Sequence, residues 1–151
     1  MTKLRKLLLV ATAISGMVTA TASPASAAYN DDFTVPTLTP GNCGSSPAGY
    51  AYFIDWGEGG LADPAWNDDY IVLRDTCRDG DGIIAFAFLN SEFLGERYNG
   101  KGFDGFVVWD PFAAVGNVDA NQNVSIRVCS VNGQYGEPYD CNRIWYVSRD
   151  G

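Results

Sequence analysis

The stretch YIVLRDTCRDGDGIIAFAFL, residues 70–89, decides the fold class of this chain. Its two ends, 70–77 and 83–89, are rich in β-branched and aromatic residues, a composition typical of strands. Between them lie two Asp-Gly steps, at 79–80 and 81–82, and such steps favour tight turns because glycine readily takes a positive φ. The stretch therefore predicts two strands joined by a hairpin turn.

Further strands are expected on either side of this stretch. The segments 50–56, 103–109, 124–129 and 144–148 are apolar or alternate between apolar and polar residues over strand lengths. From Gly49 on, no stretch of ten or more residues has helical periodicity without a glycine or proline. Six short strands with long polar connections predict an all-β domain, either a small β-sandwich or a partly closed barrel.

Aromatic residues within the expected strands are predicted to pack in the core, because they recur at alternate positions. These residues are Tyr52, Phe86, Phe88, Phe106 and Trp145.

The first 27 residues have the order of regions found in an export signal. Basic residues at 3–6 precede an apolar run at 7–14, and Ala25-Ser26-Ala27 has the A-x-A form that signal peptidase accepts. The apolar run is too short to span a bilayer. We expect residues 1–27 to be a signal peptide and the protein to be secreted into the extracellular space.

The expected mature chain is strongly acidic. Residues 28–151 contain all 18 Asp and Glu residues but only seven Lys and Arg residues, for a formal charge of −11. This charge repels phosphate backbones and anionic lipid headgroups, so neither nucleic acid nor a membrane is expected as a partner. A basic protein or a neutral sugar remains open.

All four cysteines follow the export signal, at Cys43, Cys77, Cys129 and Cys141. An even number in an exported chain predicts two disulfides. Of the three possible connectivities we favour Cys43–Cys77 with Cys129–Cys141, since the second pair would close a short loop between two expected strands. Zinc is not expected, because no pair has C-x-x-C spacing and the sequence contains no histidine.

The missing histidine also argues against an enzyme. Ser-His-Asp and Cys-His catalysis both need an imidazole, and no nucleotide-binding glycine motif is present, so we predict no cofactor and no catalytic residue. Paired carboxylates among Glu58, Glu92, Glu96 and Glu137 remain possible, but acidic loops serve solubility more often. The acidic run at 75–81 fails the calcium-loop pattern, and a turn explains it better.

Two groups of residues are candidates for binding. The first is the segment 28–42, expected to be an extended N-terminal arm ahead of a sandwich domain at 43–151, because Pro36 and Pro40 exclude a helix. Its apolar residues Phe33, Val35 and Leu38 would dock in a groove or add a strand to a partner; a loose leader is the competing interpretation.

The second group consists of tryptophans outside regular alternation. Trp66 lies in a polar segment, and Trp56 and Trp109 lie at expected strand ends. An aromatic ring flanked by acids and amides suits stacking on a sugar or contact with a protein. A ring that folds back onto the domain is an equally good interpretation.

The export signal, the Asp-Thr-Cys-x-Asp-Gly turn at 75–80, the Val-Cys-Ser at 128–130 and the late Cys141 resemble a known group. The chain is similar to small secreted actinobacterial β-sandwich proteins with two disulfides, and most of all to the adaptor subunit of umbrella toxin particles. In those antibacterial assemblies the adaptor joins a lectin subunit to a large toxin protein. The resemblance is one of layout and assigns no residue a role.

The favoured hypothesis is therefore a secreted, non-enzymatic adaptor that binds other exported proteins, which the resemblance suggests are a lectin subunit and a large toxin subunit. The alternatives are a carbohydrate-binding module that uses the tryptophans, and an inhibitor of an exported hydrolase that presents a loop at 57–69 or 131–140.

Overall fold

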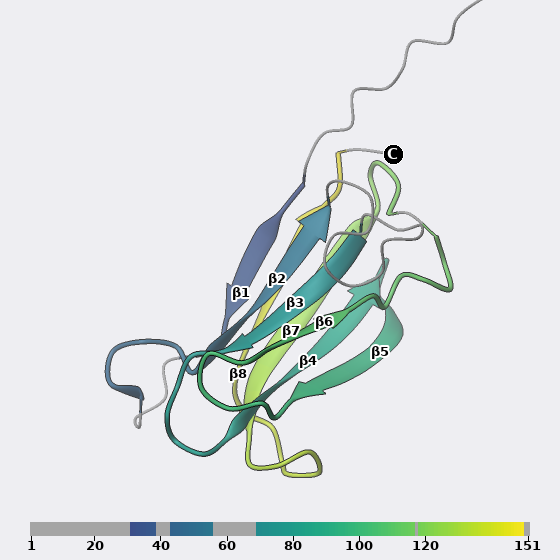
Figure 1. Ribbon diagram of the computed structural model, residues 1–151. Helices are drawn as coiled ribbons and strands as arrows, with labels where there is room; N and C mark the ends of the chain where they lie inside the picture. The colour runs from purple at the N-terminus through teal and green to yellow at the C-terminus, as the bar shows by residue number, and fades with distance from the viewer. Residues whose placement is uncertain (1–30, 39–42, 56–68, 117, 150–151) are drawn as a thin grey trace, which may run out of the picture.

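The computed structural model describes residues 31–38, 43–55, 69–116 and 118–149, which form two antiparallel sheets packed face to face (Figure 1). The expected signal peptide lies outside the described residues. The described residues include no α-helix, and no closed barrel is formed. The predicted all-β sandwich is confirmed.

Each sheet has four strands. Sheet A runs, in spatial order, β1 (Phe33–Pro36), β2 (Gly49–Asp55), β3 (Asp69–Asp75) and β6 (Phe106–Trp109). Sheet B runs β5 (Glu92–Asn99), β4 (Gly82–Leu89), β7 (Asn123–Val131) and β8 (Tyr139–Val147).

Two of the eight strands were not expected. β1 falls in the segment predicted to be an arm, and it pairs antiparallel with β2 from Phe33↔Phe53 to Pro36↔Tyr50. Its proline is tolerated because β1 is an edge strand. β5 was missed because its sequence is polar and contains Gly95, so it shows no alternation.

The hairpin predicted around residues 79–82 is wrong. β3 belongs to sheet A and β4 to sheet B, so the segment between them crosses from one layer to the other. The Asp-Gly steps do make a turn, and Asp79 Oδ1 accepts a hydrogen bond from the N–H of Asp81 at 3.0 Å. The turn directs the chain into the second sheet instead of back along the first.

Small and aliphatic side chains fill the space between the sheets. Sheet A contributes Ala51, Phe53, Ile71 and Leu73, all at most 1 % exposed. Facing them from sheet B are Ala85, Ala87, Val124, Ile126 and Val128, all fully buried. Apart from Phe53, these inward-facing side chains are thus aliphatic or small.

The prediction that the alternating aromatic residues lie in this core is wrong. Phe106 is 50 % exposed and Trp145 is 63 % exposed, while Tyr52, Phe86 and Phe88 are half-buried on the outer faces of the two sheets. Alternation showed which residues share a face but not which face is inside. Ala85 and Ala87 occupy inward positions of β4, and the rings of Phe86 and Phe88 occupy the alternate, outward positions.

Both favoured disulfides are confirmed. Cys43 is bonded to Cys77, which fixes the start of the crossing from β3 to β4, and Cys129 on β7 is bonded to Cys141 on the neighbouring β8. The described residues include no free cysteine. Two bridges are consistent with an oxidising, extracellular environment.

Candidate binding site

The segment expected to be a free arm is built into the sandwich. Val35 is fully buried, and the ring of Phe33 lies 5.3 Å from that of Phe53 and 5.6 Å from that of Tyr146. The docking role predicted for Val35 is therefore corrected to packing, whereas Phe33 is partly buried against these rings and keeps some exposed surface. Leu38 is 52 % exposed and remains accessible, with its N–H bonded to the carbonyl of Asp140 at 2.8 Å.

The tryptophan candidates do not come together. Trp109 is only 9 % exposed and belongs to the core, where it ends β6 opposite Ile71, so its predicted role in ligand stacking is corrected to packing. Trp56 and Trp66 lie outside the described residues.

A groove on the outer face of sheet A is the strongest candidate site, and no pattern in the sequence predicted it. It has a volume of about 450 Å³ and is lined by Tyr52, Ile54, Val72, Arg74, Asp104 and Phe106. The strand register explains the grouping, since Tyr52 pairs with Val72 across β2 and β3, and Arg74 pairs with Phe106 across β3 and β6. We call this site the sheet A groove.

The floor of the sheet A groove is apolar and its rim is charged. Arg74 donates through Nε to Oδ1 of Asp104 at 3.0 Å, and its terminal nitrogen contacts the same oxygen. This hydrogen bond, with the attraction between the two charges, raises the pKa of the Arg74 guanidinium. Both side chains are about half exposed, so the pair orients the rim and adds little to stability.

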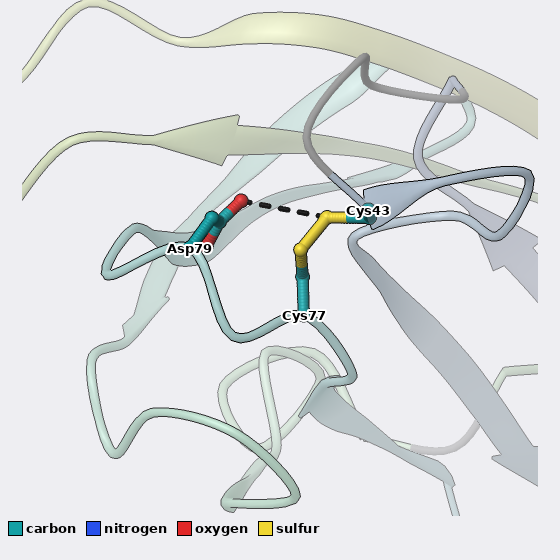
Figure 2. Close-up of side chains that lie close together, drawn as sticks. All are labelled: Cys43, Cys77 and Asp79. Atoms are coloured by element: carbon teal, nitrogen blue, oxygen red, sulfur yellow. Dashed lines mark hydrogen bonds between the residues drawn. A yellow bond between two sulfur atoms is a disulfide. The ribbon is translucent and has the colours of Figure 1, made fainter.

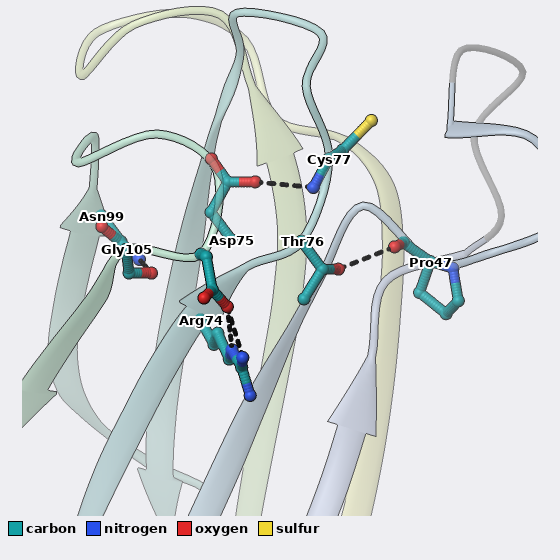
Figure 3. A network of polar contacts seen from close by, with 8 residues as sticks. Pro47, Arg74, Asp75, Thr76, Cys77, Asn99 and Gly105 are labelled. Carbon is teal, nitrogen blue, oxygen red and sulfur yellow. Dashed lines mark hydrogen bonds and ion pairs between the residues drawn. The ribbon is translucent and has the colours of Figure 1, made fainter.

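A buried asparagine holds the loop that carries this rim (Figure 3). Asn99 is fully buried at the end of β5, and its Nδ2 donates to the carbonyls of Leu73, at 3.1 Å, and Gly105, at 2.9 Å. Its Oδ1 accepts from the N–H of Lys101 at 3.1 Å. One side chain thus joins sheet B to β3 and fixes the residue before Phe106.

Asp75 lies beside this network and is 1 % exposed. Its Oδ1 accepts a hydrogen bond from the N–H of Cys77 at 3.0 Å, while Oδ2 is buried without a hydrogen-bond partner among the described residues. Burial raises the pKa of this carboxyl, the bond from Cys77 opposes the rise, and the charges of Asp79 and Asp81 add to it. The folded protein therefore holds the proton of the Asp75 carboxyl more tightly than an exposed aspartate would.

One cluster of metal-ligand residue types occurs in the described part of the chain, and its chemistry does not suit a metal. Cys43, Cys77 and Asp79 have ligand atoms within 4.8 Å of one another (Figure 2). The two sulfur atoms are joined in a disulfide, so neither is a thiolate. The 3.5 Å approach of Asp79 Oδ2 to Cys43 Sγ is a contact at the turn.

The outer face of sheet B has a different character. Phe86, Phe88, Phe93, Arg127, Arg143 and Trp145 share it, and each guanidinium lies over an aromatic ring. We call it the arginine–aromatic face. Phe86, Phe88 and Trp145 of this face were predicted to lie in the core, and the two arginines were not considered in the sequence.

Comparison with known proteins identified no matching family model, no matching curated protein and no matching solved structure. Within the described ranges, no helix has the length and hydrophobicity needed to cross a membrane.

Proposed function

We propose that this chain is an exported, non-enzymatic binding module, and that the sheet A groove receives a segment of another exported protein. The observation that carries the proposal is an open apolar groove on a solvent-facing sheet, where a monomeric domain would ordinarily place polar residues.

The chemistry of the groove favours a protein partner over a sugar. Its centre is formed by the branched aliphatic side chains of Ile54 and Val72, with Tyr52 and Phe106 beside them. A sugar needs several hydrogen-bonding groups aligned with a flat ring, whereas here Arg74 already contacts Asp104. Apolar side chains of a protein segment would fill the floor, and the ion pair would contact its polar edge.

An adaptor is the form of binding module that we favour. The two outer faces lie on opposite sides of one core, so a partner on sheet A leaves sheet B free for another. The absence of histidine from the whole sequence supports a non-enzymatic role. The resemblance to umbrella toxin adaptors suggests a lectin subunit and a large toxin subunit as the partners, and an antibacterial role.

Capture of partners from culture supernatant tests this proposal. The tagged protein, Phe106→Ala and Phe93→Ala would be incubated with supernatant of the producing organism, and bound proteins identified by mass spectrometry. Phe93 is a matched control, because it is 54 % exposed against 50 % for Phe106 and lies on the other sheet. Removing an aromatic residue from a contact centre costs roughly 2 kcal/mol or more, so we expect about 30-fold weaker capture with Phe106→Ala.

Two results would contradict the proposal. One is equal capture of the same proteins by Phe106→Ala and the unmodified protein. The other is equal loss of capture with Phe106→Ala and Phe93→Ala, which would show that the captured proteins do not bind specifically at the sheet A groove.

A second function is favoured by one specific feature, the loop between β7 and β8. Tyr135 is 94 % exposed on this loop, and the Cys129–Cys141 disulfide links the two strands that carry it. An exposed aromatic on a cross-linked loop suits the inhibitor of an exported hydrolase. Stoichiometric inhibition of a secreted protease or amylase that disappears with Tyr135→Ala would support the inhibitor function. Unchanged activity of every secreted protease and amylase tested would contradict it.

A further inference from the structure

The arginine–aromatic face is ordered by the register of sheet B. One cross-strand row contains Glu96, Phe86, Arg127 and Arg143, in the order β5, β4, β7, β8. The next row contains Phe93, Phe88, Ser125 and Trp145. A β-bulge after Ala87 brings Phe93 onto this row, with its ring 5.4 Å from that of Phe88.

The guanidinium groups of the two arginines lie over aromatic rings. The guanidinium of Arg143 lies 4.2 Å from the ring of Phe88 and 5.7 Å from that of Trp145, and its Nε donates to Ser125 Oγ at 2.6 Å. Arg127 lies 5.2 Å from the ring of Phe86. Stacking and a hydrogen bond preorganise these planar groups, which lowers the entropy lost when they bind a ligand.

Neither arginine is neutralised within the described part of the chain. No ion pair within 4.0 Å is found for Arg127 or Arg143 among the described residues, and the pair of Arg74 with Asp104 lies on the other sheet. Arg127 and Arg143 are opposite each other in the register, but their guanidinium groups have different contacts. That of Arg143 lies over Phe88, whereas that of Arg127 lies near Phe86, with its terminal nitrogen 3.1 Å from Cys141 Sγ. Glu96 shares their row, but Phe86 separates it from Arg127.

This local charge contrasts with the rest of the molecule. The chain has 18 acidic residues against 10 basic ones, and yet two arginines share the outer face of sheet B with the exposed rings of Phe93 and Trp145. A ligand that brings a negative charge can accept charge-assisted hydrogen bonds from these guanidinium groups. The aromatic rings require that the same ligand has a flat apolar side.

We propose that the arginine–aromatic face binds an acidic polysaccharide through the carboxylated pyranose rings of its uronic acid units. A carboxylate accepts paired hydrogen bonds from the planar fork of arginine, and the apolar side of a pyranose stacks on an exposed indole. Trp145, 63 % exposed on the edge strand β8, is the ring best placed for the sugar. Arg143, whose guanidinium lies 5.7 Å from the Trp145 ring, contacts the carboxylate of the same unit.

The exposed rings, and not the overall charge, narrow the choice of anion. An expected mature charge of −11 repels every polyanion, so binding has to come from the local contacts of this face. A uronic acid chain offers an apolar ring surface beside each carboxylate. The shape also fits, because the outer face of a sheet is open and can accept an extended chain.

Isothermal titration calorimetry with defined oligomers tests the proposal. The probes are tetramers of galacturonate, glucuronate and mannuronate, with neutral galactose and glucose tetramers for comparison and a tetraglutamate peptide as the acidic protein probe. We expect one uronate tetramer to bind at least about 10-fold more tightly than its neutral counterpart, because hydrogen bonds to a charged group are the stronger ones. No uronate binding below 5 mM would overturn the proposal.

Four variants assign the binding to this face. Arg143→Gln and Trp145→Ala should each weaken uronate binding by about 10-fold, and Arg143→Lys should recover only part of it, because lysine lacks the planar fork. Phe103→Ala, which removes a 48 % exposed ring outside both surfaces, should bind as the unmodified protein does. Near-ultraviolet circular dichroism shows whether each variant is folded.

Three outcomes would overturn the proposal. If Arg143→Lys bound uronate as tightly as the unmodified protein and this binding were lost in 0.3 M salt, charge attraction alone would account for it. Tetraglutamate binding as tight as that of the uronates would favour an acidic protein segment. Unchanged binding by folded Arg143→Gln and Trp145→Ala would place the site elsewhere. None of these results bears on the sheet A groove, which Phe106→Ala tests separately.

Discussion

Replacing Asn99 should lower both the stability of the sandwich and the order of the groove. Asn99→Ala removes three hydrogen bonds, two donated by Nδ2 and one accepted by Oδ1. Each bond contributes about 0.5–1.5 kcal/mol, and the loss leaves the buried carbonyl of Leu73 without this donor. We expect the free energy of unfolding to fall by about 3 kcal/mol, a large share of the roughly 5–15 kcal/mol typical of a domain.

The aspartate variant sharpens this prediction. Asn99→Asp has almost the same shape, but it places a carboxylate oxygen against the carbonyls of Leu73 and Gly105, which are both acceptors. A buried charge without a partner costs about 3–5 kcal/mol, so this variant should be less stable than Asn99→Ala at neutral pH. Protonation supplies a donor again, so the difference should shrink as the pH falls.

Urea denaturation followed by tryptophan fluorescence measures both effects. Asn142→Ala is a matched control, because the Asn142 side chain makes an exposed hydrogen bond to the N–H of Arg143, and we expect a change within about 0.5 kcal/mol. A loss below 1 kcal/mol for Asn99→Ala would refute the reasoning. So would an Asn99→Asp variant as stable as the unmodified protein.

Three more predictions use the same denaturation assay. Replacing Cys129 and Cys141 together by alanine should cost about 3 kcal/mol, since the bridge closes a loop with a sequence separation of 12; no loss would mean that the bond is absent in solution. Val35→Ala should cost about 2 kcal/mol because Val35 is fully buried, whereas a freely hanging arm would give no change. Burial raises the pKa of Asp75, so the folded state holds this proton more tightly than the unfolded chain does. Stability should therefore fall as the pH rises from the ordinary aspartate pKa of about 4 through the folded pKa. Asp75→Asn should flatten that fall, and an identical pH profile would contradict it.

Local sequence patterns were sufficient for the strands that alternate and for the pairing of the cysteines. β3, β4 and β7 have β-branched residues over strand lengths, and Cys129 and Cys141 flank one short connection. β5 could not be found in this way. It follows a two-residue turn at Asn90 and Ser91, both with positive φ, and Ser rarely adopts that conformation.

The position of β1 depended on information that is not local. A segment with two prolines has no helical or strand signal, and only the shape of the sandwich shows that Val35 fills a space beside β2. The candidate surfaces were missed for a related reason. Period-2 alternation placed Phe86 and Phe88 on one side of a strand, and the side was then assigned from hydrophobicity alone.

The choice of inward face follows from volume, and it explains why this domain has two unlike outer surfaces. β4 presents Ala85 and Ala87 to the core opposite the larger side chains of sheet A, so its phenylalanines must face outward. Exposed aromatic residues on a sheet risk aggregation unless something limits access to them. On sheet B two like charges stand beside the rings, whereas on sheet A the charged pair stands only at the rim of an apolar floor. This difference underlies the two proposals made above, a protein segment for the sheet A groove and a uronate for the arginine–aromatic face, and a module that used both would hold two chemically different partners at once.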